Sequence, residues 1–175
     1  MPFTDFLRTT VLLCSGSATA LAVVSVAGAR ADDEPTVLYV AVVWWAIAAL
    51  IGLWLGRRGE VTAGIARLLA SSRATQTLPE LQPGTVVFNR LWSLLVLTIG
   101  SGAVAFLIPQ VPAIAAGYCL LLALAWRRQS SAVEAVEQRD GVRFHVEAGS
   151  PLKPTQLVRT PGFRRNEPAH PDVRA

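Results

Sequence analysis

The sequence predicts an all-α membrane protein with four transmembrane helices and a small cytoplasmic C-terminal tail. Hydrophobic residues make up 52% of the 175 residues and charged residues only 16%, whereas roughly 25% of residues are charged in soluble domains. The segments 9–29, 37–56 and 91–126 contain no Asp, Glu, Lys, Arg or His. Because long uncharged apolar stretches are typical of membrane spans, these features argue against a soluble globular domain, a disordered chain and a nucleic-acid-binding domain.

Each of the first two uncharged segments has the roughly 20 residues that one helix needs to cross the hydrocarbon core. The third segment is too long for one helix, and it divides at Pro109-Gln110-Val111-Pro112, where two prolines indicate a turn. We therefore expect a transmembrane region over residues 1–128, with spans near 9–29, 37–56, 91–108 and 112–126.

The first span has an alternative interpretation. Met1–Arg8, an apolar run and Ala27-Gly28-Ala29 together resemble a signal peptide with a small-residue cleavage site. The apolar run is about 20 residues long, whereas the apolar core of a signal peptide is usually 7–15 residues long. We therefore favour retention of this helix; cleavage would leave three spans.

Arginines predict the orientation in the cell membrane. The 57–90 loop carries five arginines against two glutamates, and the tail opens with Arg127 and Arg128. The segment between the first two spans contains Asp32-Asp33-Glu34 instead. Basic flanks stay on the cytoplasmic side, so we expect the 57–90 loop, the tail and both termini to be cytoplasmic. Their charge would attract anionic lipid rather than nucleic acid.

Two elements are expected outside the spans on the cytoplasmic side. In the 57–90 loop, Ile65, Leu68 and Leu69 recur at helical spacing, which predicts an interfacial helix near 61–75, with a plain polar loop as the alternative. The second element is a membrane-proximal tail segment at 129–149.

Within this tail segment, residues 130–139 either continue the fourth helix or form a first strand. Asp140-Gly141 indicates a turn, and 142–147 alternates as a strand does, so that 133–138 would be its hairpin partner. Residues 150–175 are rich in proline, and we expect a flexible segment there.

The spans offer little chemistry. They contain no Asp, Glu, Lys, Arg or His, which argues against a proton-coupled transporter. Their serines and threonines are expected to form interhelical hydrogen bonds rather than to line a pore. Cys14 and Cys119 are expected to pack among apolar neighbours, and His145 to face solvent from the polar side of its strand.

No motif for a cofactor, a metal ion or a catalytic nucleophile is present, so we predict no catalytic, cofactor-binding or metal-binding residue and no enzyme. A membrane enzyme would have to use Glu134, Glu137 or Asp140, which have no spaced partner in the sequence.

Small residues four positions apart predict close helix packing, because they let helix backbones approach each other in lipid. These residues are Gly16 and Ala20 in the first span, Ala48, Gly52 and Gly56 in the second, and Ala113 and Gly117 in the fourth. Basic and aromatic residues in the tail predict a surface for a protein partner or for anionic lipid: Arg143, Phe144, Arg159, Phe163, Arg164 and Arg165.

The C-terminal half carries a resemblance. Pro109-Gln110-Val111, Gly117-Tyr118 and Ala125-Trp126-Arg127-Arg128 are followed by Arg139–Phe144 and Leu157–Phe163. This series resembles small multi-pass membrane proteins of actinobacteria, a family with no assigned function. The resemblance therefore implies neither an activity nor site residues.

These observations predict a non-enzymatic accessory or scaffold protein of the membrane, whose basic cytoplasmic loop and tail contact a partner or anionic lipid. The alternative is a small homo-oligomeric transporter or channel for an uncharged or lipid-like solute. The expected partners are membrane lipids and either another protein or further copies of this chain, and we expect no cofactor.

Overall fold

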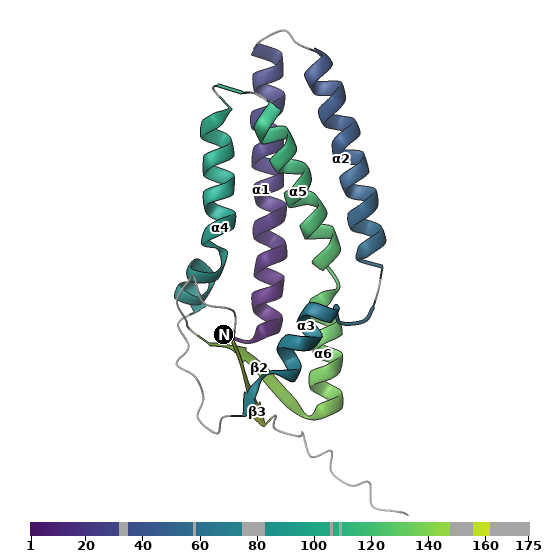
Figure 1. Ribbon diagram of the computed structural model, residues 1–175, viewed down its shortest axis with the longest axis vertical. Coiled ribbons are helices and arrows are strands. Elements are labelled where there is room, and N and C mark those ends of the chain that lie inside the picture. Colours follow the sequence, from purple (N-terminus) through teal and green to yellow (C-terminus); the bar gives the residue numbers. More distant parts are fainter. Residues whose placement is uncertain are drawn as a thin grey trace, which may run out of the picture.

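The computed structural model describes residues 1–31, 35–57, 59–74, 83–105, 107–108, 110–147 and 156–161. This part of the chain is mostly helical. Four long helices stand side by side (Figure 1): α1 (Phe3–Ala31), α2 (Pro35–Leu55), α4 (Pro83–Val104) and α5 (Gln110–Trp126). Four helical stretches are long and apolar enough to cross a membrane, the fourth being Gln110–Asp140, which joins α5 to α6. The prediction of four membrane-length helices is confirmed.

The helix ends differ from the predicted ones. α1 begins at Phe3 rather than near 9, and α4 runs from Pro83 to Val104 rather than from 91 to 108. The early starts have a common cause. The first turns of both helices carry apolar side chains, Phe3 and Val86 among them, that are buried beneath the long helices. These turns are helical because they pack against other parts of the protein. A search of the sequence for uninterrupted apolar runs does not detect such packing.

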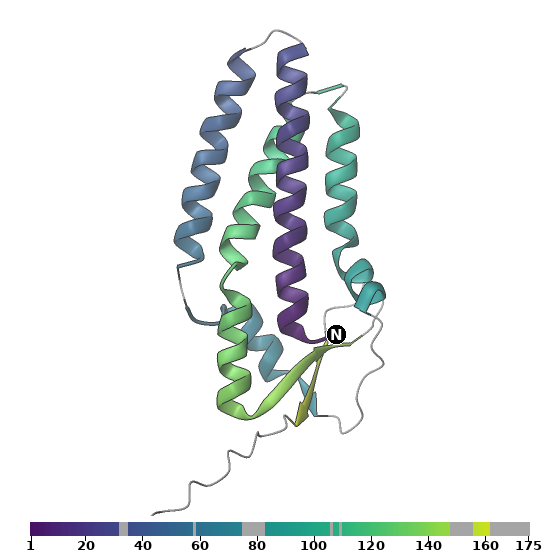
Figure 2. The ribbon, with the colours of Figure 1, turned by 180° about the vertical axis from the view of Figure 1, so that it is seen from behind.

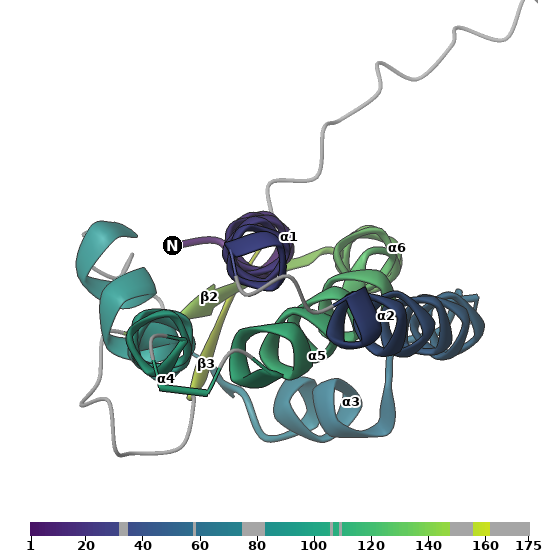
Figure 3. The ribbon, with the colours of Figure 1, turned by 90° about the horizontal axis from the view of Figure 1, so that it is seen from above.

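Helix α5 is the centre of the bundle. It makes its most extensive contacts with α1 and α2 and fewer with α4. Seen from above, α5 lies between α2 and α4, with α1 beside it (Figure 3). Its buried residues are mainly small: Ala113, Ala115, Ala116, Gly117, Cys119 and Ala123. Small side chains allow the neighbouring backbones to approach closely.

Three glycines lie at the contact between α2 and α5. A Cβ atom added to Gly52 would lie 2.9 Å from the carbonyl oxygen of Leu121, and one added to Gly56 would overlap the carbonyl oxygen of Leu124. A Cβ atom on Gly117 would overlap the indole ring of Trp44. Ala48 and Ala113, which belong to the same predicted faces, are also buried.

Two indole groups hold α2 to α5. The Nε1 atom of Trp44 donates a hydrogen bond to the carbonyl oxygen of Ile114 at 3.2 Å, and that of Trp45 donates to Ala113 at 2.8 Å. Trp44 also meets the ring of Tyr118 edge to face, with 5.5 Å between the ring centroids. A backbone carbonyl has two lone pairs, so it can accept an indole proton in addition to its helical bond.

Two expectations for the long helices differ from the structure. Gly16 and Ala20 lie on the exposed side of α1, and no described atom is within 4 Å of a Cβ atom added at Gly16. Several hydroxyl groups expected to bond between helices bond within their own helix instead. Thr10, Ser15, Thr19, Ser25 and Thr98 each donate to the carbonyl four residues earlier. The local acceptor is always within reach, so it competes successfully with a neighbouring helix.

The remaining elements gather at one end of the bundle, where the N-terminus also lies (Figure 2). They are α3 (Ala63–Ala70), β1 (Arg73–Ala74), α6 (Gln129–Asp140), β2 (Val142–Val146) and β3 (Leu157–Pro161). We call these five elements, together with Met1–Leu7, the end unit.

Of the two alternatives for 130–139, the helical one is found, because these residues lie within α6, and the hairpin of 133–138 with 142–147 is wrong. The strand partner of β2 is β3, within the segment 150–175 that was expected to be flexible. The Asp140-Gly141 signal marks the end of α6, where Gly141 has a φ of 64° and its amide donates to the carbonyl of Glu137. This left-handed conformation favours glycine and turns the chain directly into β2.

We predict that Gly117→Ala destabilises the protein in detergent by about 1–3 kcal/mol, as overpacking of a filled contact does. The added methyl group would displace the Trp44 indole from its hydrogen bond. The measurement is the thermal unfolding midpoint of the purified protein. Gly16→Ala is the matched control, since open space surrounds that position. Equal midpoints for the two variants would contradict the close contact of α2 and α5.

Candidate functional site

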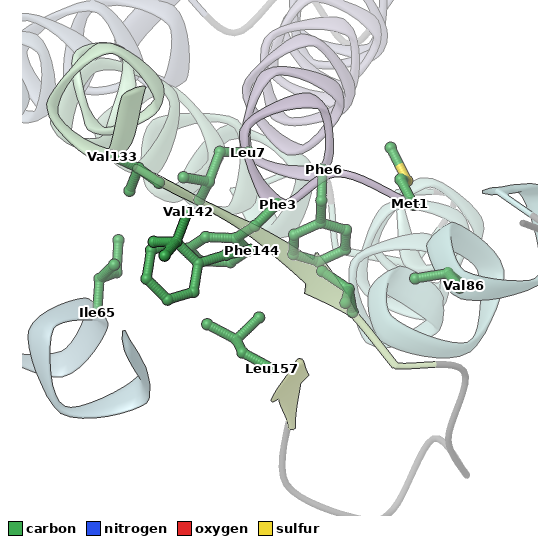
Figure 4. Packing of buried hydrophobic residues seen from close by; sticks show 11 residues of the cluster. Met1, Phe3, Phe6, Leu7, Ile65, Val86, Val133, Val142, Phe144 and Leu157 are labelled. Atoms are coloured by element: carbon green, nitrogen blue, oxygen red, sulfur yellow. The ribbon is translucent and has the colours of Figure 1, made fainter. Parts of the chain in front are cut away.

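The end unit has a hydrophobic core of its own (Figure 4). Phe3, Phe6 and Leu7 come from the first turns of α1, and Phe3 and Phe6 lie with their ring centroids 6.3 Å apart. Residues from α3, α4, α6, β2 and β3 complete the core with Met1: Ile65, Val86, Val133, Val142, Phe144, Val146 and Leu157. Segments far apart in the sequence are thereby held in one folded unit.

A small sheet joins the same segments. Its strand order is β1-β3-β2, with β1 parallel and β2 antiparallel to β3. On the other side of β2, Pro2 forms an antiparallel bridge with His145, and the amide of Val146 donates to the carbonyl of Met1 at 2.9 Å. The N-terminal residues, the 59–74 segment and the tail therefore share one backbone hydrogen-bond network.

The predicted segment 61–75 contains a helix, α3, which is shorter than expected. Its Ile65 is buried in the core of the end unit, and Leu68 and Leu69 pack against that core. The buried side chain of Gln129 holds the residues that precede α3. Its Oε1 atom accepts a hydrogen bond from the backbone amide of Thr62 at 3.1 Å, and its Nε2 atom donates one to the carbonyl of Glu60 at 3.5 Å. The apolar side of α3 thus contacts protein.

The three predicted contact residues of the tail that the structure describes, Arg143, Phe144 and Arg159, do not form one surface. Phe144 and Arg159 are paired across the strands and so share one face of the sheet, whereas Arg143 lies on the other face. Arg143 and Arg159 are both exposed. Phe144 is only 4% exposed and belongs to the core, where its amide also donates to the Oε1 atom of Glu137 at 2.9 Å. Phe163, Arg164 and Arg165 lie outside the described residues.

His145 is buried rather than solvent-facing, with 7% of its surface exposed. Its Nδ1 atom lies 3.3 Å from the hydroxyl oxygen of Thr160, and that hydroxyl group donates to the carbonyl of Arg143 at 3.2 Å. Burial lowers the pKa of His145, and the positive charges of the N-terminal amino group and of Arg143 lower it further. The alternation of β2 correctly places His145 opposite Phe144, but it does not reveal that both faces are covered.

The outer surface of the end unit is rich in arginine. Arg8 of α1 forms an ion pair with Glu134 of α6 at 2.6 Å, and Arg139 forms one with Asp140 at 2.9 Å. Exposed pairs of this kind contribute little to stability. Other arginines at this end of the molecule are also exposed: Arg57, Arg67, Arg73, Arg127, Arg128, Arg143 and Arg159.

A groove of about 290 Å³ lies between α1, α4 and α5, directly above the end unit. Most of its lining is apolar, and Arg90 is its one charged residue among ten described lining residues. From α1 come Phe6, Thr10, Val11 and Cys14; from α4 come Arg90, Leu91, Ser93 and Leu94; and from α5 come Leu122 and Trp126.

The described residues contain no group of three or more His, Cys, Asp or Glu side chains that could hold a metal ion. Cys14 and Cys119 are both buried and not bonded to each other. Helix α6 carries Glu134, Glu137 and Asp140. Glu134 pairs with Arg8, and Glu137 accepts a hydrogen bond from the amide of Phe144. The arrangement can bind charged or apolar surfaces, and its described part does not assemble an acid–base or nucleophile pair.

Comparison with known protein families, with curated proteins and with solved structures finds no match. The resemblance to actinobacterial membrane proteins therefore stays a prediction.

The lowered pKa of His145 predicts that the sheet loses stability on acidification. An unfolded chain binds a proton at a histidine pKa of about 6.5, whereas the folded chain resists protonation until the pH is lower. The contribution of His145 to the free energy of unfolding is therefore fully present above about pH 6.5, and it is lost as the pH falls through the pKa of the folded state. Hydrogen exchange of β2 and β3, compared between pH 7.5 and pH 5, measures this loss.

His145→Gln is the control, because it removes this titration and leaves that of every other group. Its exchange protection is expected to change less with pH than that of the wild type. Identical pH profiles for the two proteins would contradict the assignment.

Proposed function

We propose that this protein is a non-enzymatic accessory or scaffold protein of the cytoplasmic membrane. Its four long helices anchor it in the bilayer, and the end unit lies in the cytoplasm and contacts a protein partner. One observation carries the proposal: the N-terminal residues, the 59–74 segment and the tail form a single folded unit with a basic exterior at one end of the helices. An anchor alone has no need of such a unit.

The distribution of side chains supports insertion into a bilayer. The contacts between α2 and α5 bury small residues, whereas large apolar residues on the outside of the helices are more than half exposed: Leu12, Val23, Tyr39, Val40, Leu50 and Ile99. Soluble monomers rarely expose apolar surface on this scale. In lipid, the same surface costs nothing to expose, and helices associate through close packing.

The distribution of arginines supports the orientation. The exposed arginines of the end unit lie at the opposite end of the bundle from Arg30, the last basic residue of α1. By the positive-inside rule, this distribution supports a cytoplasmic location for the end unit, with the N-terminal residues and β3. Retention of α1 follows from the same proposal, since Phe3, Phe6 and Leu7 are part of the core that holds the end unit together.

We predict opposite labelling of two cysteine variants, Ala31→Cys at the far end of α1 and Glu147→Cys after β2. Both positions are exposed. A membrane-impermeant maleimide should label Ala31→Cys in intact cells, but Glu147→Cys only after the membrane is opened. The wild-type chain is the control, because its two cysteines are buried. The reverse pattern would invert the orientation, and labelling of both variants in intact cells would contradict insertion.

The partner is tested by affinity purification of the full chain from its native membrane in mild detergent. Truncation of the tail is unsuitable, because Phe144, Val146 and Leu157 belong to the core and their loss would unfold the end unit. Arg143→Glu and Arg159→Glu instead change one exposed charge on each face of the sheet. We expect at least one of them to release a partner that the wild-type chain retains and that binds the purified wild type directly.

Arg30→Glu is the matched control at the opposite end, and it should retain the partner. Membrane extraction of all three variants should be unchanged. A homo-oligomer of the chain alone, indifferent to both substitutions in the sheet, would overturn the accessory function. That outcome would favour the transporter or channel alternative, which solute flux into liposomes would then measure.

A further inference from the structure

The groove between α1, α4 and α5 combines two chemistries. Its walls are apolar over most of their surface, with Val11, Leu94 and Leu122 among the lining residues. Between Phe6 and Cys14 it follows α1 for about 12 Å, given a rise of about 1.5 Å per residue. Among the described lining residues, the one charged group is the guanidinium of Arg90. An occupant with one anionic group and one apolar chain would match both parts.

The groove also lies at a defined level of the bundle. Phe6, Arg90 and Trp126 all belong to the ends of their helices that adjoin the end unit. In the proposed orientation, this level is the border between the cytoplasmic headgroups and the hydrocarbon core. Indole side chains such as that of Trp126 favour this border, and basic sites between helices on the cytoplasmic side bind anionic headgroups.

We propose that this groove binds an anionic phospholipid of the inner leaflet. The phosphate group lies against the Arg90 guanidinium, whose planar donors match phosphate oxygens. An acyl chain follows the apolar wall towards Cys14, and Ser93 and Trp126 lie beside the headgroup. The inference rests on the proposed insertion into the membrane, and it adds a specific lipid to that proposal.

The test uses the fluorescence of Trp126 in the full-length protein reconstituted into bilayers of phosphatidylglycerol and phosphatidylcholine. Bromine atoms on the acyl chains of one lipid or the other quench nearby tryptophans. The contribution of Trp126 is the difference between the wild type and Trp126→Phe. One charge pair near a membrane surface is worth about 1 kcal/mol, so we expect brominated phosphatidylglycerol to occupy the site about fivefold more readily than brominated phosphatidylcholine.

Arg90→Gln should abolish this preference, and Arg90→Lys should keep part of it. Arg67→Gln is the matched control, because Arg67 is an exposed arginine of α3 outside the groove, and it should keep the full preference. Ser93→Phe narrows the groove without changing charge or adding a tryptophan, so it should reduce quenching of Trp126 by both lipids. This variant tests the site independently if Arg90→Gln does not fold.

Three outcomes would overturn the proposal. Equal quenching by the two brominated lipids in the wild type would mean that the groove does not select an anionic headgroup, although the protein is inserted. Removal of the preference by millimolar inorganic phosphate would indicate a site for a free anion rather than for a phospholipid. Absence of quenching by either lipid would contradict membrane insertion itself, and with it the proposed function.

Discussion

The close approach of α5 to its neighbours is the constraint on which the rest of the structure depends. A helix in lipid gains nothing from burying apolar surface as such, so association requires dense packing and hydrogen bonds between helices. Gly52, Gly56 and Gly117 provide the space, and the indole groups of Trp44 and Trp45 provide hydrogen bonds to the carbonyls of α5. With α5 fixed against α1 and α2, its C-terminal end delivers α6 and the tail to the same place as the first turns of α1.

The end unit is stabilised by different physics. Outside the bilayer the hydrophobic effect operates, and burial of one large apolar side chain contributes about 1.5–3 kcal/mol. The core of the end unit accordingly contains Phe3, Phe6, Leu7 and Phe144, whereas the contacts of α5 bury alanine, glycine and cysteine. The buried residues of the bundle are thus of the kind that allows close packing, and those of the end unit are of the kind that gains most from the hydrophobic effect. Along α1, Phe3 and Phe6 are buried in the end unit, whereas Ala18 and Leu21 are buried against the small residues of α5.

The sequence predicts the local features of this fold well and the non-local ones poorly. Helix content and the small-residue contacts of α2 depend on residues within one segment, and both are found. The partner of β2 could not be predicted, because β3 is separated from it by the 147–156 connection and was expected to be flexible. The burial of His145 likewise depends on Pro2, more than a hundred residues away. Phe144 is different, because the alternation of apolar and polar residues over 142–147 is a local feature that is compatible with its burial.

Two side chains connect the groove to the end unit. Phe6 lines the groove and also belongs to the hydrophobic core beneath it, and Leu91 lines the groove while packing against the same core. An occupant of the groove therefore touches residues that hold the N-terminal turns of α1 and α4 in the end unit. Because α4 has fewer contacts with the bundle than α1 or α2 has, its position depends more on these shared residues. Lipid in the groove would thus act on the placement of the end unit through packing alone, without any change in the sheet that carries Arg143 and Arg159.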